Sequence, residues 1–194
     1  FNDMVVDYNF NQVTNAQNHV VEIKAKLILK AMGASFKNGF GIQMEVPSAQ
    51  VASVSGSRLF ENLVTLNANG TEAGQSKATA IVFDNGFKIL PHPGFPSVGV
   101  NTTPGAPYVQ PDTINLLVTL ASAVPISVIG TPPYNPFLIV NQDRGREVHL
   151  AGYPSTALAN PAPSGTVQDD SNPSIGRYYV TENNLCWAID VAGP

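Results

Sequence analysis

The first residues of the chain place carboxylate and amide oxygens close together. Asn2, Asp3 and Asp7 lie in the opening run FNDMVVDYNF. Calcium takes six to eight oxygen ligands and often collects them from segments rich in Asp and Asn. These three residues are therefore the first candidates for a calcium site. The alternation of apolar and polar residues around them is equally compatible with polar side chains on the surface of a strand.

Two later stretches carry acidic residues at spacings that could suit a cation. Asp143 and Glu147 lie in NQDRGRE, and Asp169 and Asp170 are adjacent in QDDSNPSIG. The first stretch departs from the EF-hand pattern, because Gly145 falls at the fifth position and the sequence continues as a strand. Asp and Asn side chains also stabilise turns by bonding to nearby backbone groups. Both stretches are therefore weaker metal candidates, with a turn as the alternative explanation.

A glutamate and a histidine share one face of a predicted strand. Glu147 and His149 are two residues apart, so their side chains point the same way. Such a pair could supply two metal ligands, or a general base and the group that orients it. The alternative is that both side chains lie on the solvent-exposed surface of the strand.

Aromatic residues in the loops suggest a second kind of site. Tyr108, Tyr134 and Tyr153 lie in or beside segments rich in proline and glycine. Exposed tyrosines beside acids and amides could bind sugars, whereas the alternative is that these rings pack beneath long loops. Cys186 is the single cysteine and is followed by Trp187, an apolar setting that predicts a small buried side chain.

The sequence contains none of the catalytic motifs that have a recognisable spacing. It has no Gly-x-Ser-x-Gly elbow, no His-Glu-x-x-His helix, no Walker loop and no Gly-x-Gly-x-x-Gly run after a strand. We therefore expect a protein without enzymatic activity.

The composition limits the classes of protein and of partner. Charged residues make up only 12%, whereas 16 glycines and 16 prolines supply frequent turns. This mixture disfavours both disorder and helices. A net charge of −4, with ten Lys and Arg spread along the chain, argues against nucleic-acid binding. No apolar stretch approaches the ~20 residues of a membrane-spanning helix.

Alternation with period two predicts antiparallel strands. In residues 19–30, Ile23 and Leu27 lie on one face, and Lys24 and Lys26 lie on the other. Further strands are expected at 4–10, 40–46, 49–55, 58–66, 77–83, 113–120, 137–141 and 146–150. Short strands separated by turns predict an all-β fold in a single domain over 1–194, an antiparallel β-sandwich or jelly roll with long Pro-, Gly- and Asn-rich loops.

Two turns suggest hairpins. Asn38 and Gly39 form a tight-turn dipeptide, so residues 21–46 are predicted to fold as one hairpin. The run QDRG at 142–145 is predicted to connect the last two strands as another hairpin.

Four blocks of the sequence together resemble the LruC-type domain. They are FNDMVVDYNFNQVTNAQNHVVEIKAK, MGASFKNGFGIQM, PYNPFLIVNQDRGREVHLAGYPSTALA and RYYVTENNLCWAI. This domain occurs in exported proteins and lipoproteins of Bacteroidetes and other bacteria. Its opening acidic motif is longer than the Phe1, Asn2 and Asp3 present here, and the family continues past the Trp-Ala-Ile block. The resemblance therefore implies a chain trimmed at both ends.

The resemblance also implies a location and a modification. A protein of this family is exported, and it lies at the cell surface, associated with the outer membrane or extracellular. The Asp-rich opening is similar to those of calcium-binding extracellular domains, which supports Ca²⁺ as a cofactor. In the same bacteria, Asp-Thr before an apolar residue can accept an O-glycan, and Asp112-Thr113-Ile114 fits that pattern. Thr113 could equally be the first residue of a strand.

Three functions remain open at this point. The first is a noncatalytic module for adhesion, binding a protein or a glycan at the cell surface. The second is a carbohydrate-binding domain or, with less support, a carbohydrate-cleaving one. The third is a structural subunit that assembles by strand exchange through exposed sheet edges.

Overall fold

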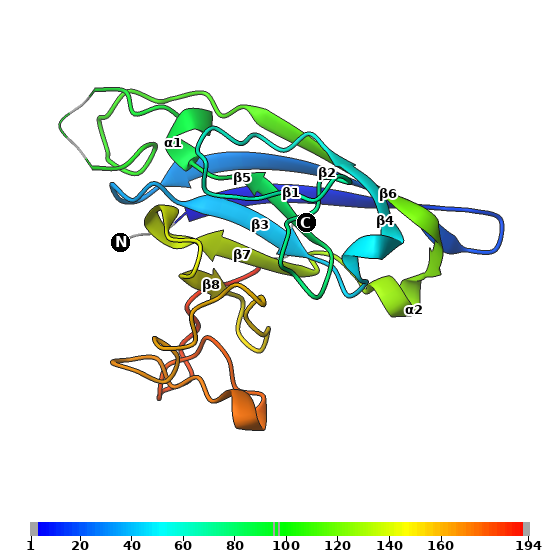
Figure 1. Ribbon diagram of the computed structural model, residues 1–194. Helices are drawn as coiled ribbons and strands as arrows, with labels where there is room; N and C mark the ends of the chain where they lie inside the picture. Colours follow the sequence, from blue (N-terminus) through cyan, green and yellow to red (C-terminus); the bar gives the residue numbers. More distant parts are fainter. Residues whose placement is uncertain (1–3, 95, 97, 192–194) are drawn as a thin grey trace.

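A computed structural model describes residues 4–94, 96 and 98–191, and the strands in these residues form two four-stranded antiparallel sheets (Figure 1). Sheet A has the order β1-β2-β6-β4, and sheet B has the order β5-β3-β7-β8. The strands are β1 (Met4–Thr14), β2 (His19–Met32), β3 (Gly39–Gln43), β4 (Val51–Ser55), β5 (Thr79–Phe83), β6 (Thr113–Pro125), β7 (Asn135–Ile139) and β8 (Glu147–His149). The prediction of an all-β sandwich is confirmed.

Short helical turns connect some of the strands. They are η1 (Ser48–Gln50), α1 (Gly86–Ile89), α2 (Ile126–Ile129), η2 (Val140–Gln142) and η3 (Pro173–Ile175). Each is one turn long, as expected for a sequence rich in residues that form turns rather than helices.

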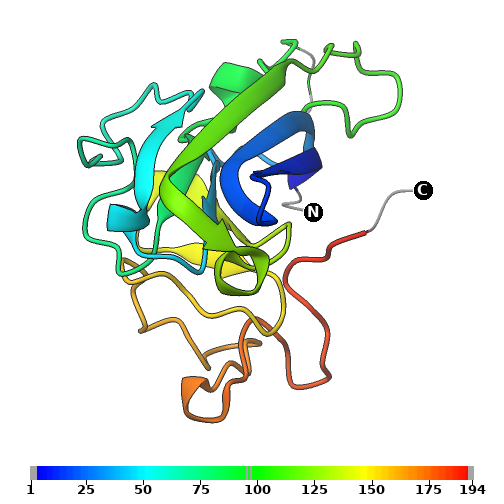
Figure 2. The same ribbon diagram turned by 90° about the vertical axis from the view of Figure 1, so that its right-hand side faces the viewer.

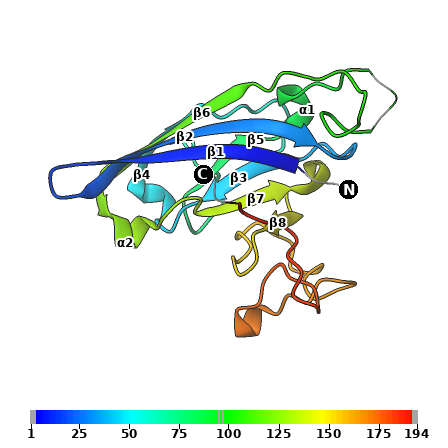
Figure 3. The ribbon, with the colours of Figure 1, turned by 180° about the vertical axis from the view of Figure 1, so that it is seen from behind.

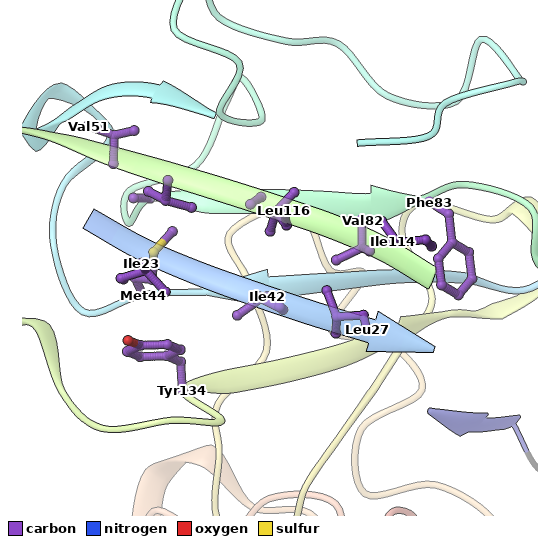
Figure 4. Packing of buried hydrophobic residues seen from close by; sticks show 14 of the residues in the cluster. Ile23, Leu27, Ile42, Met44, Val51, Val82, Phe83, Ile114, Leu116 and Tyr134 are labelled. Atoms are coloured by element: carbon purple, nitrogen blue, oxygen red, sulfur yellow. The ribbon is translucent and has the colours of Figure 1, made fainter. Parts of the chain in front are cut away.

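The core lies between the two sheets, and the alternation in the sequence builds it (Figure 4). In β2, Ile23 and Leu27 are buried while Lys24 and Lys26 are exposed, as predicted. From sheet B, Ile42 and Val82 belong to the same buried cluster. Burying an aliphatic side chain of this size stabilises the fold by about 1.5–3 kcal/mol.

The predicted hairpin at 21–46 is wrong. β2 pairs with β1 and β6 in sheet A, whereas β3 pairs with β5 and β7 in sheet B. Residues 33–38 therefore carry the chain from one sheet to the other. Asn38 is buried there, and its Oδ1 accepts a hydrogen bond from the backbone of Asn141 at 3.0 Å. The second hairpin is confirmed, because β7 and β8 pair with His149 opposite Phe137.

The strand expected at 58–66 is also wrong. This segment is irregular, and the carboxylate of Asp84 accepts hydrogen bonds from the backbone of Phe60 and Glu61, both at 2.8 Å. Its apolar residues Leu59 and Leu63 pack against the outer face of sheet B rather than joining a ladder. The apolar pattern is typical of a strand, but here these side chains cover the face of a sheet.

The outer faces of the two sheets differ. After β8 the chain forms a segment without regular strands, residues 150–191, which lies outside the sandwich on the β8 side (Figure 2). Thr156 and Tyr179 of this segment pack on the outer side of sheet B, as does the 58–66 segment. Near its end, Asp190 accepts a hydrogen bond from the hydroxyl of Tyr8 in β1 at 2.5 Å. Figure 3 shows the molecule from behind, with β1, β2 and β6 of sheet A in front. The outer face of sheet A therefore carries the exposed side chains of its own strands.

Candidate functional site

The first calcium candidate falls mainly outside the described residues. Asn2 and Asp3 are not among them. Asp7 lies in β1 with an exposed carboxylate, which is 3.4 Å from the ammonium group of Lys30 in β2. The described part of this stretch thus forms a surface ion pair, a kind of contact that contributes little to stability.

The weaker acidic candidates on loops bind neighbouring donors. Oδ1 of Asp143 accepts a hydrogen bond from the backbone of Gly145 at 3.0 Å, which closes the turn before β8. Asp169 accepts bonds from Ser171 and from the indole of Trp187. Asp170 pairs with Arg177 at 2.9 Å. In the part of the chain that the structure describes, no three His, Cys, Asp or Glu side chains gather in a metal-binding arrangement.

Glu147 and His149 are buried, so the alternative that both side chains lie on a solvent-exposed strand surface is wrong. The side chains of both residues have no solvent-exposed area. They point to the outer face of sheet B, as alternation requires, but loops distant in the sequence cover that face. Nε2 of His149 lies 2.8 Å from Oε2 of Glu147.

An arginine and a second glutamate complete a buried polar network. Arg144, in the turn between β7 and β8, donates to both carboxylate oxygens of Glu72, at 2.5 Å and 2.6 Å. It also donates to Oε1 of Glu147. Glu72 accepts a further bond from Gln75 at 2.7 Å. We call the set Glu72, Gln75, Asn135, Arg144, Glu147, His149 and Thr156 the buried network.

The loop after β8 closes the buried network over Glu147. Thr156 donates its backbone N–H to Oε2 at 2.9 Å and its hydroxyl to Oε1 at 2.5 Å. Burial raises the pKa of Glu147, but hydrogen bonds from His149, Thr156 and Arg144 outweigh that effect and bring the pKa to about 2. Glu147 is therefore ionised at neutral pH.

The hydrogen-bond partners of His149 both present acceptors to its ring. Nδ2 of Asn135 donates to the carbonyl of Pro154 at 3.0 Å, so Oδ1 of Asn135 faces Nδ1 of His149 at 2.6 Å. The other ring nitrogen faces the ionised Glu147. Both partners are acceptors, and only a ring with two N–H groups satisfies both. Burial lowers the pKa of His149 below its ordinary value, the Glu147 carboxylate offsets this only in part, and the charge of Arg144 lowers it further. Because both bonds need a donor, the geometry favours the imidazolium.

Two aromatic rings enclose His149. Phe137 in β7 stacks on it with ring centroids 5.1 Å apart, and Tyr179 packs against it at 4.9 Å. Burial is the main reason that the pKa of Tyr179 is raised to about 12. Arg144 donates to both Glu72 and Glu147, so each carboxylate of the buried network has a cationic partner. Such a closed arrangement can hold loops in place. No local sequence pattern indicates that Glu72, Gln75 or Thr156 belongs to it.

The three candidate tyrosines have different environments. Tyr134 is buried beside β1, where its hydroxyl accepts a hydrogen bond from Gln12 at 2.9 Å. Tyr153 is half-buried, and Tyr108 is 67% exposed on the loop before β6. The ring of Tyr134 meets that of Phe10 edge-on, with centroids 5.5 Å apart. Among the described residues, none of the three tyrosines stacks on another of the three. Of the three, Tyr108 alone presents a largely open ring.

Cys186 and Thr113 complete the predicted positions. Cys186 is exposed, which corrects the expectation of a buried side chain, because residues 150–191 have too little apolar packing to enclose it. Thr113 is the first residue of β6 and pairs with Ile28. Its carbonyl accepts a hydrogen bond from Arg58, whose guanidinium also pairs with Asp112 at 2.5 Å.

The outer face of sheet A holds an open hollow. Its volume is about 290 Å³, and it lies across the middle of β1, β2 and β6. The side chains that line it from the outer face are Asn9, Asn11, Lys24, Lys26, Asn115 and Leu117. Alternation in the sequence predicts which residues of β1 and β2 share this face, but it does not predict that β6 lies beside β2. Most of the surface that solvent reaches inside the hollow is apolar, and the amide and lysine side chains belong to the residues around it.

These features define a class of protein, a two-sheet β-sandwich in which the described segments cover the outer face of sheet B but leave that of sheet A open. The chain belongs to the family described as Domain of unknown function (DUF4842), whose sequence model matches residues 18–194. Comparisons with curated proteins and with solved structures give no match. Within the described residues, no helix has the length and apolar character needed to cross a membrane.

Proposed function

We propose that this chain is a noncatalytic binding module of the bacterial cell surface, related to the LruC type, which holds its partner on the outer face of sheet A. The observation that supports it best is the contrast between the two sheets. On sheet B, the 58–66 segment and the loops of the buried network cover the outer face. On sheet A, exposed polar side chains surround a hollow of about 290 Å³.

The chemistry of the buried network supports the same proposal. Its carboxylates and imidazole are bonded to one another and to backbone groups, and they are shielded from solvent. A general base has to reach a substrate proton within hydrogen-bond distance. Glu147 and His149 are therefore better suited to holding loops than to catalysis.

A glycan is the partner class that the hollow favours. Amide side chains both donate and accept hydrogen bonds, which matches the dual character of sugar hydroxyls. Asn9, Asn11 and Asn115 supply three such groups in one hollow. A protein partner on the same face is the alternative.

Strand exchange is a second candidate function, because one observation favours it. β1 spans Met4–Thr14 at the edge of sheet A, and among the described strands it pairs only with β2. An edge of this length could accept a strand from another copy. Size-exclusion chromatography that shows a strict monomer over a wide concentration range would remove this candidate.

Calcium binding belongs to the proposal as a separate part, carried by Asn2, Asp3 and Asp7. A cation there would compete with the Lys30 ammonium for the Asp7 carboxylate. A ligand that binds only the folded form raises apparent stability. A rise in Tm with calcium that is lost on Asp7→Asn substitution would support this part, and an unchanged Tm with calcium and with chelator would remove it.

The experiment that tests the binding function combines a glycan array with a broad hydrolase screen. We expect saturable binding to at least one surface polymer and no turnover. Hydrolysis of a glycan or peptide at ordinary enzyme rates, roughly 1–10³ per second, would overturn the proposal.

A further inference from the structure

The hollow on sheet A is built from two rows of side chains in register. Cα pairing places Asn9 opposite Lys26, and Lys26 opposite Asn115. The next row along the face places Asn11 opposite Lys24, and Lys24 opposite Leu117. Because directly opposite residues on paired strands point to the same side, each row presents its side chains together. Each row thus has a lysine residue at its middle.

The two lysines make the hollow locally positive on a chain with net charge −4. Lys26 forms no ion pair with any residue that the structure describes. Lys24 lies 3.6 Å from Glu22, and both side chains are solvent-exposed enough for this contact to be weak. An anionic group that enters the hollow would therefore meet one unpaired ammonium and one loosely paired one.

The chemistry of the hollow favours a glycan over an extended peptide. β2 lies between β1 and β6 and pairs with both, so its backbone donors and acceptors are used by the sheet. An extended peptide gains its affinity from main-chain bonds at a sheet edge, which this face does not offer. Side-chain amides and ammonium groups, with the aliphatic Leu117 beside them, suit hydroxyls and carboxylate or sulfate groups.

The lining residues also distinguish charged glycans from neutral ones. None of the described residues that line the hollow is aromatic, so none of them offers a ring on which a sugar could stack. Binding has to depend on hydrogen bonds and charge, and hydrogen bonds with an ionised partner are roughly twice as strong as neutral ones.

We propose that the outer face of sheet A binds an anionic glycan, with Lys24 and Lys26 contacting its acidic groups and Asn9, Asn11 and Asn115 contacting its hydroxyls. This inference rests on the proposed binding function and specifies its ligand. The acidic group can be a carboxylate or a sulfate, since an ammonium group binds either.

The test measures binding of the whole chain to immobilised polymers. The probes are polygalacturonate for carboxylates, dextran sulfate for sulfates, unmodified dextran as the neutral polymer and polyglutamate as the acidic polypeptide. We expect binding to one or both anionic glycans that weakens as salt is raised from low to physiological ionic strength, because exposed charges are screened. We expect at least tenfold weaker binding to dextran and to polyglutamate.

Three variants locate the site. Lys26→Gln and Lys24→Gln remove one charge each from the hollow, and each should weaken binding to the anionic glycan by about tenfold. Lys37→Gln makes the same charge change in the 33–38 connection and should bind as the unmodified protein does. Since all three lysines are exposed, Tm should stay unchanged in each variant.

The outcomes separate this inference from the general binding function. Equal binding by the double variant Lys24→Gln/Lys26→Gln and the unmodified protein overturns the inference, and so does absence of binding to both anionic glycans. Tighter binding to dextran or polyglutamate overturns the inference but leaves a binding module. Turnover of any probe overturns the binding function itself.

Discussion

Oε2 of Glu147 and Nε2 of His149 lie 2.8 Å apart, in side chains that solvent does not reach. The pair lies on the outer face of sheet B, where Thr156 and Arg144 bond to the same carboxylate. Residues from separate segments of the chain thus bond to the single carboxylate of Glu147. A buried ion pair stabilises a fold only when the remaining donors and acceptors are also satisfied. Here each charged group has several partners, so the buried network fixes the loops that cover sheet B.

Removing the charge of Glu147 should destabilise the protein strongly. In Glu147→Gln, the carboxamide cannot accept from all of His149, Thr156 and Arg144, and it leaves buried positive charge unbalanced. We expect a loss of about 3 kcal/mol in the free energy of unfolding, measured by urea titration. Glu45→Gln is the control, because its ion pair with Lys77 is solvent-exposed and should be worth less than about 1 kcal/mol. Equal losses in both variants would contradict the structural role of Glu147.

His149 should carry two ring protons at neutral pH in the folded protein. Its Nδ1 faces Oδ1 of Asn135 at 2.6 Å, and its Nε2 faces the Glu147 carboxylate. Nitrogen-15 NMR should show both ring nitrogens at N–H shifts, each with a directly bonded proton that exchanges slowly with water. A ring nitrogen at the shift of an unprotonated imidazole would contradict this prediction. His19, which is only partly buried, supplies an internal reference in the same spectrum.

Stability should fall as acid protonates Glu147. Its folded-state pKa is about 2 and its ordinary value is 4.5, so its contribution is complete above pH 4.5 and is lost as the pH falls toward 2. This lowering of the pKa corresponds to about 3 kcal/mol in the free energy of unfolding. Urea unfolding between pH 7 and pH 2.5 measures the loss, and subtracting the profile of Glu147→Gln isolates the share of this carboxylate. If the two profiles are parallel, the pKa of Glu147 is not depressed in the folded state.

The sequence predicted the alternating strands well and the covering of their faces poorly. Lys24 and Lys26 were placed correctly on the outer face, because period two needs only the strand itself. Asn115 became their neighbour only through the strand order β1-β2-β6, which has no local signal. Likewise, alternation predicts that Glu147 and His149 share one face. That face is buried because Thr156 bonds to Glu147 and Tyr179 packs on His149, and neither contact has a local signal.

The same limit explains the incorrect hairpin. The dipeptide Asn38-Gly39 suits a tight turn between paired strands, and its composition also suits a connection between sheets. Contacts with residues distant in the sequence determine that residues 33–38 connect the two sheets. The backbone N–H of Gly86 bonds to the Asn38 carbonyl at 2.8 Å, and Asn141 bonds to its side chain.

Gly41 should be intolerant of a side chain, since it makes room for the ring that stacks on His149. Gly41 lies opposite Phe137 in sheet B, and an added Cβ would lie 2.8 Å from Cε1 of that ring and 3.0 Å from Cδ1 of Ile81. Gly41→Ala should therefore force Phe137 to move and cost about 1–3 kcal/mol in the free energy of unfolding, measured by urea titration.

Two further variants show whether the Phe137 ring is the cause. Gly145→Ala is the matched control, because a Cβ there would meet its nearest atoms at an ordinary 3.4 Å, and Tm should change little. In the double variant Gly41→Ala/Phe137→Leu, the ring atoms that the added Cβ would meet are absent. The double variant should therefore lose less stability than the sum of the two single variants. Strict additivity would show that the cost at Gly41 comes from the strand backbone, and the stacking of Phe137 on His149 would then not depend on this glycine.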